Sequence, residues 1–324
     1  AQSYGNEDAV GSAIAKCGVP RDQLFLTTKV WISNAGYEKA KASIDKSLKN
    51  LQTDYIDLLL IHQPFGDYYG TYRAMEEAYK AGKLRAIGMS NFYPDRLIDL
   101  CQFVEVTPAV NQVETHVFQQ QKAAHEYMEK YHVQHESWGP FAEGRKDFFT
   151  NPILVEIGEK YGKSSAQVAL RFLLQSDVVV IPKSTHKERM EQNINVFDFT
   201  LSSEDMAAIR LKKILSQNPK LIKGYHLLAL IQMKNQEWNK ARRTLKKAAR
   251  IDKTNTTTLR FLREVDEQTG VTTKIEKRRK GLFGNEKNEN DNISGEIVVR
   301  PSSYKERSKI SLFFTTVLGF AAGA

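Results

Sequence analysis

Short apolar runs alternate with stretches of helical periodicity from Leu24 onward. Between the first two runs, Ala40, Ile44, Leu48 and Leu51 recur every three or four residues on one face of a predicted helix. Strands that alternate with helices predict parallel pairing through right-handed crossovers. The six runs are LFLTTKVW (24–31), YIDLLLIH (55–62), LRAIGMSN (84–91), PAVNQVE (108–114), VQHESW (133–138) and VVVIPKS (178–184).

The first residues of the chain carry a helix-start signature. Asn6 has the side chain of a helix cap, and Glu7 and Asp8 place negative charge in the first turn. The pattern predicts a helix that runs to about Lys16. Only three residues precede Tyr4, although a capped helix normally follows a segment that places it.

Polar side chains stand at or just past the carboxyl end of each apolar run. In a (β/α)8 barrel these strand ends converge on one mouth, where active sites are built. The alternative is an open sheet, but no glycine-rich GxGxxG turn follows any run. The pattern therefore favours an α/β fold of the TIM-barrel type, with six of its eight strands found. The polar residues are Lys29, His62, Ser90 with Asn91, Gln112, Trp138 and Lys183.

Tyr4, Lys29 and His62 would bring a phenol, an ammonium and an imidazole to this mouth. A positive charge beside a phenol favours the phenolate, so the phenol gives up its proton more readily near neutral pH. An imidazole beside it can hydrogen-bond a carbonyl oxygen and orient it. The set suits protonation of an alkoxide as hydride reaches the carbon, and the hydride must come from a cofactor. Lys183 and Arg189 carry charge suited to a phosphate.

Seven motifs resemble the aldo-keto reductase family, in its bacterial branch that reduces small aldehydes and keto-sugars. The resemblance covers residues 1 to about 209, with the motifs in the family's order and spacing. It implies a TIM barrel that reduces aldehydes, ketones or keto-sugars to alcohols with NADPH. The motifs are SYGNE, TTKVW, YIDLLLIHQP, IGMSNF, NQVE, SWGPF and IPKSTHKERMEQN.

The resemblance also implies a role for each matching residue. From the family's Asp, Tyr, Lys and His tetrad it implies Tyr4 as general acid, Lys29 as its charged partner and His62 as the residue that orients the carbonyl. Trp31 would line the substrate pocket. The implied cofactor residues are Ser90, Asn91 and Gln112 for the carboxamide, Trp138 under the nicotinamide, Lys183, Ser184 and Arg189 for the 2′-phosphate, and Gln192 and Asn193 near the adenine. Gln192 stands where the family usually has Glu, which weakens the adenine assignment.

The resemblance begins and ends inside the family's pattern. In the family the tetrad Asp and further strands precede AQSYGNE, and a final helix and a substrate-covering tail follow EDMAAI; this sequence has neither. We therefore expect a poor or inactive reductase, because six strands leave two open edges and Lys29 lacks the carboxylate that keeps it charged. A gene fusion and an artefact of sequence assembly would each produce such a chain.

The character of the chain changes near Ile209. Residues 1–209 hold 22 Lys and Arg against 27 Asp and Glu, a net charge of −5, whereas residues 210–324 hold 25 against 11, a net charge of +14. Two helical patterns joined by a polar turn at KNQE, with partial copies on either side, resemble a tetratricopeptide repeat over residues 210–270. An ordinary helical hairpin is the alternative. A repeat would offer a surface for a protein partner.

The last 54 residues divide into a charged linker at 271–309 and an uncharged tail at 310–324. A membrane helix needs about 20 apolar residues, so the tail resembles the first part of one. The positive YKERSK segment would then lie on the cytoplasmic side. An apolar tail or a core helix is the alternative.

Other groups of residues have simpler explanations. His116, His125, His132 and His135 match no common zinc spacing, so we expect no metal. Asp57, inside a strand pattern, is interpreted as structural. The basic helix face made by Lys240, Arg242, Arg243, Lys246, Lys247 and Arg250 lacks interleaved aromatic residues, so we expect no nucleic-acid partner.

Two readings of function follow from the sequence. The first is an NADPH-dependent reductase acting on a small carbonyl substrate, with the barrel in the cytoplasm; two cysteines without CxxC spacing favour that reducing compartment. The alternative is a non-catalytic, membrane-tethered interaction protein whose working part is the repeat.

Overall fold

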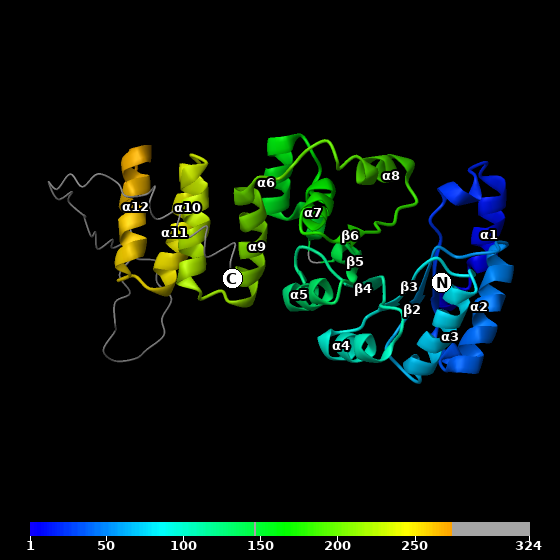
Figure 1. Ribbon diagram of the computed structural model, residues 1–324. Helices are drawn as coiled ribbons and strands as arrows, with labels where there is room; N and C mark the ends of the chain where they lie inside the picture. Colours follow the sequence, from blue (N-terminus) through cyan, green and yellow to red (C-terminus); the bar gives the residue numbers. More distant parts are fainter. Residues whose placement is uncertain (146, 274–324) are drawn as a thin grey trace, which may run out of the picture. The chain divides into compact units, whose positions relative to one another are not determined.

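The structure, a computed structural model, describes residues 1–145 and 147–273 (Figure 1). The chain divides into two compact units, residues 1–201 and 202–324. The strands of the first unit are β1 (Thr27–Val30), β2 (Leu58–Ile61), β3 (Ile87–Ser90), β4 (Val110–Glu114), β5 (Gln134–Trp138) and β6 (Val179–Val180). Its helices are α1 (Glu7–Lys16), α2 (Tyr37–Leu51), α3 (Tyr68–Lys80), α4 (Pro94–Phe103), α5 (Lys122–Lys130), α6 (Pro152–Tyr161), α7 (Ser165–Leu174) and α8 (Lys187–Ile194).

The six predicted strands are all present and form one parallel sheet in the order β1-β2-β3-β4-β5-β6. Because every right-handed crossover then moves one strand in the same direction, the connecting helices belong on one face of the sheet. This sequential order is that of a barrel wall, whereas a doubly wound sheet reverses its order at a switch point. The strand order therefore agrees with the predicted barrel architecture.

Two local predictions need correction. The run at 178–184 forms only the two-residue strand β6, because Pro182 has no N–H for a ladder and the chain leaves the sheet before it. Helix α1 begins at Glu7 as predicted, but the side chain of Asn6 accepts no capping hydrogen bond. The backbone carbonyl of Asn6 instead accepts from the N–H of Val10.

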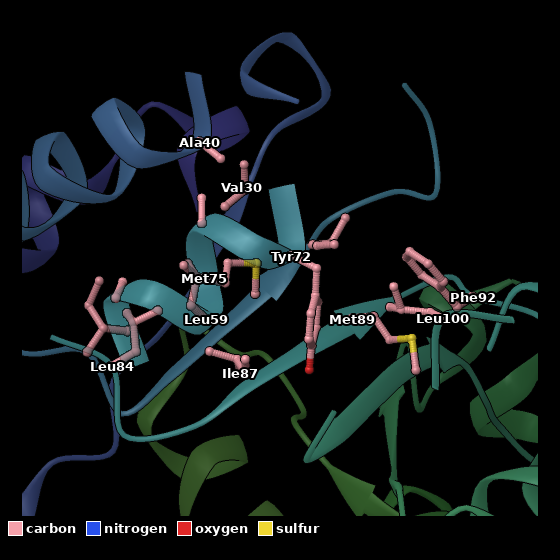
Figure 2. Close-up of a cluster of buried hydrophobic side chains, with 14 of the residues drawn as sticks. Val30, Ala40, Leu59, Tyr72, Met75, Leu84, Ile87, Met89, Phe92 and Leu100 are labelled. Carbon is pink, nitrogen blue, oxygen red and sulfur yellow. The ribbon is translucent and has the colours of Figure 1, made fainter. Parts of the chain in front are cut away.

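The core of the first unit lies between the sheet and the helices that follow its strands. The predicted apolar face of α2 is buried, with Ala40 and Ile44 at most 1% exposed. Figure 2 shows Tyr72 and Met75 from α3 beside strand residues such as Leu59, and all three are fully buried. The hydroxyl of Tyr72 donates to a backbone carbonyl at Val106, so this buried phenol keeps a hydrogen-bond partner.

Asp57, just before β2, holds together the segments that lead into β1, β2 and β3. Its carboxylate lies 2.8 Å from Arg21 and 3.1 Å from Arg85, and it accepts the N–H of Leu26. Both guanidinium groups also lie about 4 Å from the ring centroid of Tyr55, at 4.0 and 3.9 Å. These contacts agree with the interpretation of Asp57 as structural.

The second unit is helical in its described part. Its helices are α9 (Ser203–Gln217), α10 (Ile222–Lys234), α11 (Trp238–Ile251) and α12 (Thr256–Thr269). Helix α9 runs through residue 209, where the sequence changes character, and α10 and α11 are joined by the predicted polar turn. Ala229, Ala241 and Leu245 are fully buried where α10 and α11 pack together. The helical prediction is confirmed, and the tetratricopeptide assignment stays a prediction.

The basic face of α11 is partly used within the unit. Lys240 pairs with Glu237 at 3.0 Å and Arg242 with Asp266 at 3.2 Å, while Arg243 is exposed. Within residues 1–145 and 147–273, no helix combines the length and apolar character needed to cross a membrane. The linker beyond residue 273 and the tail at 310–324 lie outside the described residues, and membrane contact has no support elsewhere in the chain.

Candidate active site

Tyr4, Lys29 and His62 lie together at the carboxyl ends of β1 and β2. The Nζ atom of Lys29 is 6.0 Å from the ring centroid of Tyr4, and the rings of Tyr4 and His62 meet edge to face at 5.7 Å. Lys29 and His62 are buried, at 9% and 8% exposure, whereas Tyr4 is 61% exposed. The indole of Trp31 also contacts the His62 ring, with centroids 4.9 Å apart. The Tyr4 phenol is thus accessible to an incoming molecule, whereas the Lys29 ammonium and the His62 imidazole beside it are buried.

The short turn that carries Tyr4 is anchored by its neighbour Gln2. The Gln2 Oε1 atom accepts the N–H of Trp31 at 3.0 Å and an amide hydrogen of Asn34 at 2.8 Å, while its Nε2 donates to Ser47 at 3.1 Å. Gly5 then ends the turn with φ of 59°, a conformation that glycine adopts without strain. Gln2 therefore attaches the turn that carries Tyr4 to the end of β1 and to α2, a role that the sequence alone did not show.

Glu7 provides a second anchor for this turn. From the sequence it was interpreted only as a negative charge in the first turn of a helix. Its carboxylate is buried, accepting from the Thr28 hydroxyl at 2.6 Å and from the Ser47 hydroxyl at 3.1 Å. Thr28 precedes Lys29 on β1, and Ser47 belongs to α2. Glu7 thus ties the start of α1, three residues from Tyr4, to the strand that carries Lys29.

His62 is held neutral by its surroundings. Burial, followed by the positive charge of Lys29, lowers the pKa of His62 to about 4. The Ser3 hydroxyl oxygen lies 3.2 Å from Nδ1 of the ring. When that hydroxyl donates to Nδ1, the neutral ring carries its hydrogen on Nε2 and can donate it to an oxygen.

Asn91 joins several of the predicted site residues. Its Nδ2 donates to the backbone carbonyl of His62 at 3.0 Å and to the Ser90 hydroxyl at 3.1 Å, and its Oδ1 accepts from the indole of Trp138 at 2.8 Å. Asn91 has φ of 65°, a left-handed conformation that Asn tolerates better than most residues. Ser90 in turn donates to the backbone carbonyl of Gln112 at 2.9 Å. These hydrogen bonds therefore connect the carboxyl ends of β2, β3, β4 and β5.

Glu136, on β5, is a site residue that the sequence analysis missed. It accepts a hydrogen bond from Nε2 of Gln112, which lies opposite it on β4. Burial raises the pKa of Glu136, while the bond from Gln112 and the charge of Lys29 act against that rise. Burial lowers the pKa of Lys29, and the charge of Glu136 opposes that shift. The charges of Lys29 and Glu136 therefore favour each other's ionised form, against the effect of burial on both.

Among the residues that the structure describes, two buried amide oxygens have no hydrogen-bond partner. They are Oδ1 of Asn111 and Oε1 of Gln112, on side chains at most 1% exposed. Leaving a buried acceptor unpaired costs about 1–3 kcal/mol of folding free energy, so a donor on a bound molecule would form a favourable hydrogen bond with it. The amide N–H2 of a nicotinamide carboxamide is a donor of that kind, and this region is therefore chemically suited to the nicotinamide end of a cofactor.

The predicted phosphate and adenine residues lie beyond β6. Lys183 and Ser184 are in the loop that follows the strand, and Arg189, Gln192 and Asn193 are on α8. Lys183, Arg189 and Gln192 are exposed, and Ser184 and Asn193 are half-buried. The exposed cations remain open to an anionic ligand, and none of these five residues makes a hydrogen bond or ion pair with Tyr4, Lys29 or His62.

Three of the four histidines considered for a metal site contact other side chains or each other. Nδ1 of His125 is 3.0 Å from Nδ1 of His135, and Nε2 of His135 is 2.7 Å from the Thr115 hydroxyl. His116 lies 3.3 Å from a carboxylate oxygen of Glu114. These contacts explain His116, His125 and His135 as packed side chains.

Comparison with known proteins agrees with this geometry. The model of the Aldo/keto reductase family matches residues 1–214. The glyoxal reductase of Bacillus subtilis (strain 168) is 47% identical over 207 residues, which cover 64% of this chain and 74% of that protein. An aldo-keto reductase from a Medee basin deep-sea metagenome library matches 64% of this chain and 78% of its own, with a TM-score of 0.63 and 45% identity. A Bombyx mori aldo-keto reductase in complex with NADP matches 64% and 75%, with a TM-score of 0.61 and 33% identity.

These likenesses define the chain as an oxidoreductase of the class that acts on carbonyl groups. It belongs to the aldo/keto reductase family.

Proposed function

We propose that the chain reduces small aldehydes, ketones or keto-sugars to alcohols with NADPH. The observation that carries the proposal is the convergence of Tyr4, Lys29 and His62, with Tyr4 exposed to solvent and the other two buried beneath it. The Bacillus subtilis relative is named for reduction of glyoxal, a small dicarbonyl, which points to substrates of that size.

The side chains would divide the work on the carbonyl oxygen. His62, neutral because its pKa is about 4, can donate Nε2–H to that oxygen and orient it. Tyr4 can transfer its hydroxyl proton to the oxygen as the alkoxide develops, and the Lys29 ammonium would stabilise the phenolate left behind. The indole of Trp31, against His62, would line the pocket for the rest of the substrate.

The cofactor would supply the hydride when bound. Gln112 would accept from the carboxamide through its unpaired Oε1, and Ser90 and Asn91 would complete that contact. Trp138, fixed by its bond to Asn91, offers its ring to the nicotinamide. Lys183, Ser184 and Arg189 would hold the 2′-phosphate, with Gln192 and Asn193 near the adenine.

Binding and turnover test the proposal separately. NADPH binding is measured as quenching of protein fluorescence, and turnover as loss of NADPH absorbance with glyoxal as the probe substrate. Tyr4→Phe should keep NADPH affinity while lowering kcat by about 10²–10⁴-fold, the usual worth of a general acid. A chain that binds no NADPH, or a measurable turnover that Tyr4→Phe leaves unchanged, would refute the proposal. The expected impairment of turnover stays a prediction that the same assay measures.

The alternative of a membrane-tethered interaction protein gains no support from the described residues. The tetratricopeptide-like character of the helical unit stays a proposal, and so does its binding of a protein partner.

A further inference from the structure

We propose that Glu136 is a positioning residue of the reductase site that sets the orientation of the Gln112 side chain. This inference rests on the proposed function, because Gln112 and Lys29 are given cofactor-binding and catalytic roles there. Glu136 itself is assigned no contact with substrate or cofactor.

The partners of Glu136 distinguish it from the other buried carboxylates of the first unit. Glu7 accepts from hydroxyl groups of β1 and α2, Asp57 pairs with Arg21 and Arg85, and Glu76 accepts the backbone N–H groups of Glu105 and Val106. Those contacts connect parts of the scaffold. Glu136, at 7% exposure, instead interacts with two residues of the proposed site. Because a buried carboxylate is unfavourable unless it is compensated, those two residues account for its presence there.

The bond to Glu136 decides which way the Gln112 amide faces. Gln112 and Glu136 are directly opposed in the β4–β5 register, and Nε2 of Gln112 donates to Oε1 of Glu136. In the reverse orientation the amide oxygen would face the carboxylate, and two acceptors would repel each other. Glu136 therefore turns the Gln112 oxygen away from itself, and that is the oxygen left without a partner. An acceptor is thereby presented to a carboxamide N–H2 before any cofactor arrives.

The charge of Glu136 acts on Lys29. The Tyr4 ring centroid lies 6.0 Å from Nζ of Lys29, and electrostatic interactions link Lys29 to His62, the amino group of Ala1 and the carboxylate of Glu136. Among these groups Glu136 is the acidic one that opposes the effect of burial on Lys29. With Glu136 ionised, Lys29 stays protonated to higher pH and remains able to stabilise a phenolate at Tyr4.

Two substitutions separate the two roles. Glu136→Gln keeps the shape and an oxygen acceptor for Gln112 but removes the charge, whereas Glu136→Met also removes the acceptor. In Glu136→Gln the pKa of Lys29, followed by NMR, should fall because the opposing charge is gone, with NADPH affinity changed less than about twofold. The alkaline limb of the kcat/KM profile should move down with it. In Glu136→Met, NADPH affinity should fall about tenfold, the loss of an oriented hydrogen bond.

Glu76→Gln is the matched control, since it removes a buried carboxylate from the scaffold between α3 and the chain before β4. It should leave both the Lys29 titration and NADPH affinity unchanged, and circular dichroism checks that each variant is folded. Full NADPH affinity in folded Glu136→Met overturns the role of Glu136, and an unshifted Lys29 titration in Glu136→Gln removes its electrostatic effect on Lys29. Failure of the unmutated chain to bind NADPH overturns the proposed function instead, and the Lys29 titration, made without cofactor, still decides the electrostatic part.

Discussion

The hydroxyl of Ser3 lies 3.2 Å from Nδ1 of His62 and connects the turn that carries Tyr4 to the imidazole beside it. A neutral imidazole has one N–H, and its position is set by the partner of the other nitrogen. With Ser3 donating, the hydrogen lies on Nε2, the nitrogen that remains to donate to a carbonyl oxygen. Ser3 is therefore expected to control the tautomer of His62.

We predict that Ser3→Ala lowers kcat/KM for glyoxal by about 3- to 10-fold, the worth of one hydrogen bond. Ser3→Thr keeps the hydroxyl and should retain most of the activity. Nitrogen NMR of the histidines should show the Nε2–H form of His62 in the unmutated chain and a mixture of tautomers in Ser3→Ala. A ring that keeps the same tautomer in both proteins would remove the role of Ser3.

Two buried histidines should make the fold sensitive to acid. Burial, followed by the charge of Lys29, lowers the pKa of His62 to about 4, and burial, followed by the charge of His125, lowers that of His135 to about 4. An unfolded histidine binds its proton near pH 6.5, so between these values the unfolded chain holds more protons. The free energy of unfolding is then complete above about pH 6.5 and falls as the pH drops toward 4, by about 1.4 kcal/mol per unit of pKa difference for each ring.

Denaturant titrations at several pH values measure this loss directly. His135→Gln keeps a side-chain amide beside Thr115. This variant should reduce the fall in the free energy of unfolding between pH 6.5 and 4. NMR should detect no titration of His62 between pH 5.5 and 8. A His62 ring that protonates near pH 6.5 would contradict its proposed neutral role.

Cofactor choice should depend on the cations beyond β6. Arg189, exposed on α8, and Lys183 suit a 2′-phosphate, so NADPH should bind more tightly than NADH. Arg189→Ala should reduce this preference by about 1–3 kcal/mol, because a hydrogen bond to a charged group has roughly that value. Lys187→Ala, on the same helix, is the control and should change it less. Equal affinity of the unmutated chain for both cofactors would rule out the assignment.

The carboxyl ends of the strands could be predicted from the sequence because polar residues at those positions interrupt apolar runs. Lys29 and His62 follow this pattern, and the structure brings both to Tyr4. Glu136 was missed because it lies in QHESW, a strand whose polar letters resemble alternation with a solvent face. Only the three-dimensional fold shows that this carboxylate is buried and opposite Gln112. Glu7 was missed for a similar reason, since an acidic residue in a first helical turn is already explained by the helix dipole.

The Asp57 cluster should contribute strongly to the stability of the first unit. Asp57→Ala leaves the Arg21 and Arg85 guanidinium groups without their shared carboxylate and the N–H of Leu26 without its acceptor. Removing one partner of a buried pair costs about 3–5 kcal/mol, although the exposure of Arg85 places the expected loss at the low end. Glu105→Ala breaks the exposed pair with Lys80 and should cost much less, because solvent screens such a pair. Urea unfolding followed by circular dichroism compares the two, and equal losses would contradict the structural role of Asp57.

Glu7 should affect catalysis without touching the reacting atoms. Its buried carboxylate accepts from Thr28 and Ser47, and it begins the helix that follows the Tyr4 turn. Glu7→Gln replaces one acceptor oxygen by a donor, so one of the two hydroxyl bonds is weakened and the turn loses part of its attachment to β1. We expect the free energy of unfolding to fall by about 1–2 kcal/mol.

Because Tyr4 is then held less firmly beside Lys29, kcat should fall, whereas NADPH affinity should change little, since the proposed cofactor residues lie on other strands and on α8. Asp8→Asn, exposed in the same helical turn, is the matched control and should leave both kcat and stability nearly unchanged. Steady-state kinetics with glyoxal, NADPH titration and urea unfolding separate the effects. If Glu7→Gln lost NADPH affinity in parallel with kcat, the damage would extend across the barrel, and Glu7 would not be a local anchor of Tyr4.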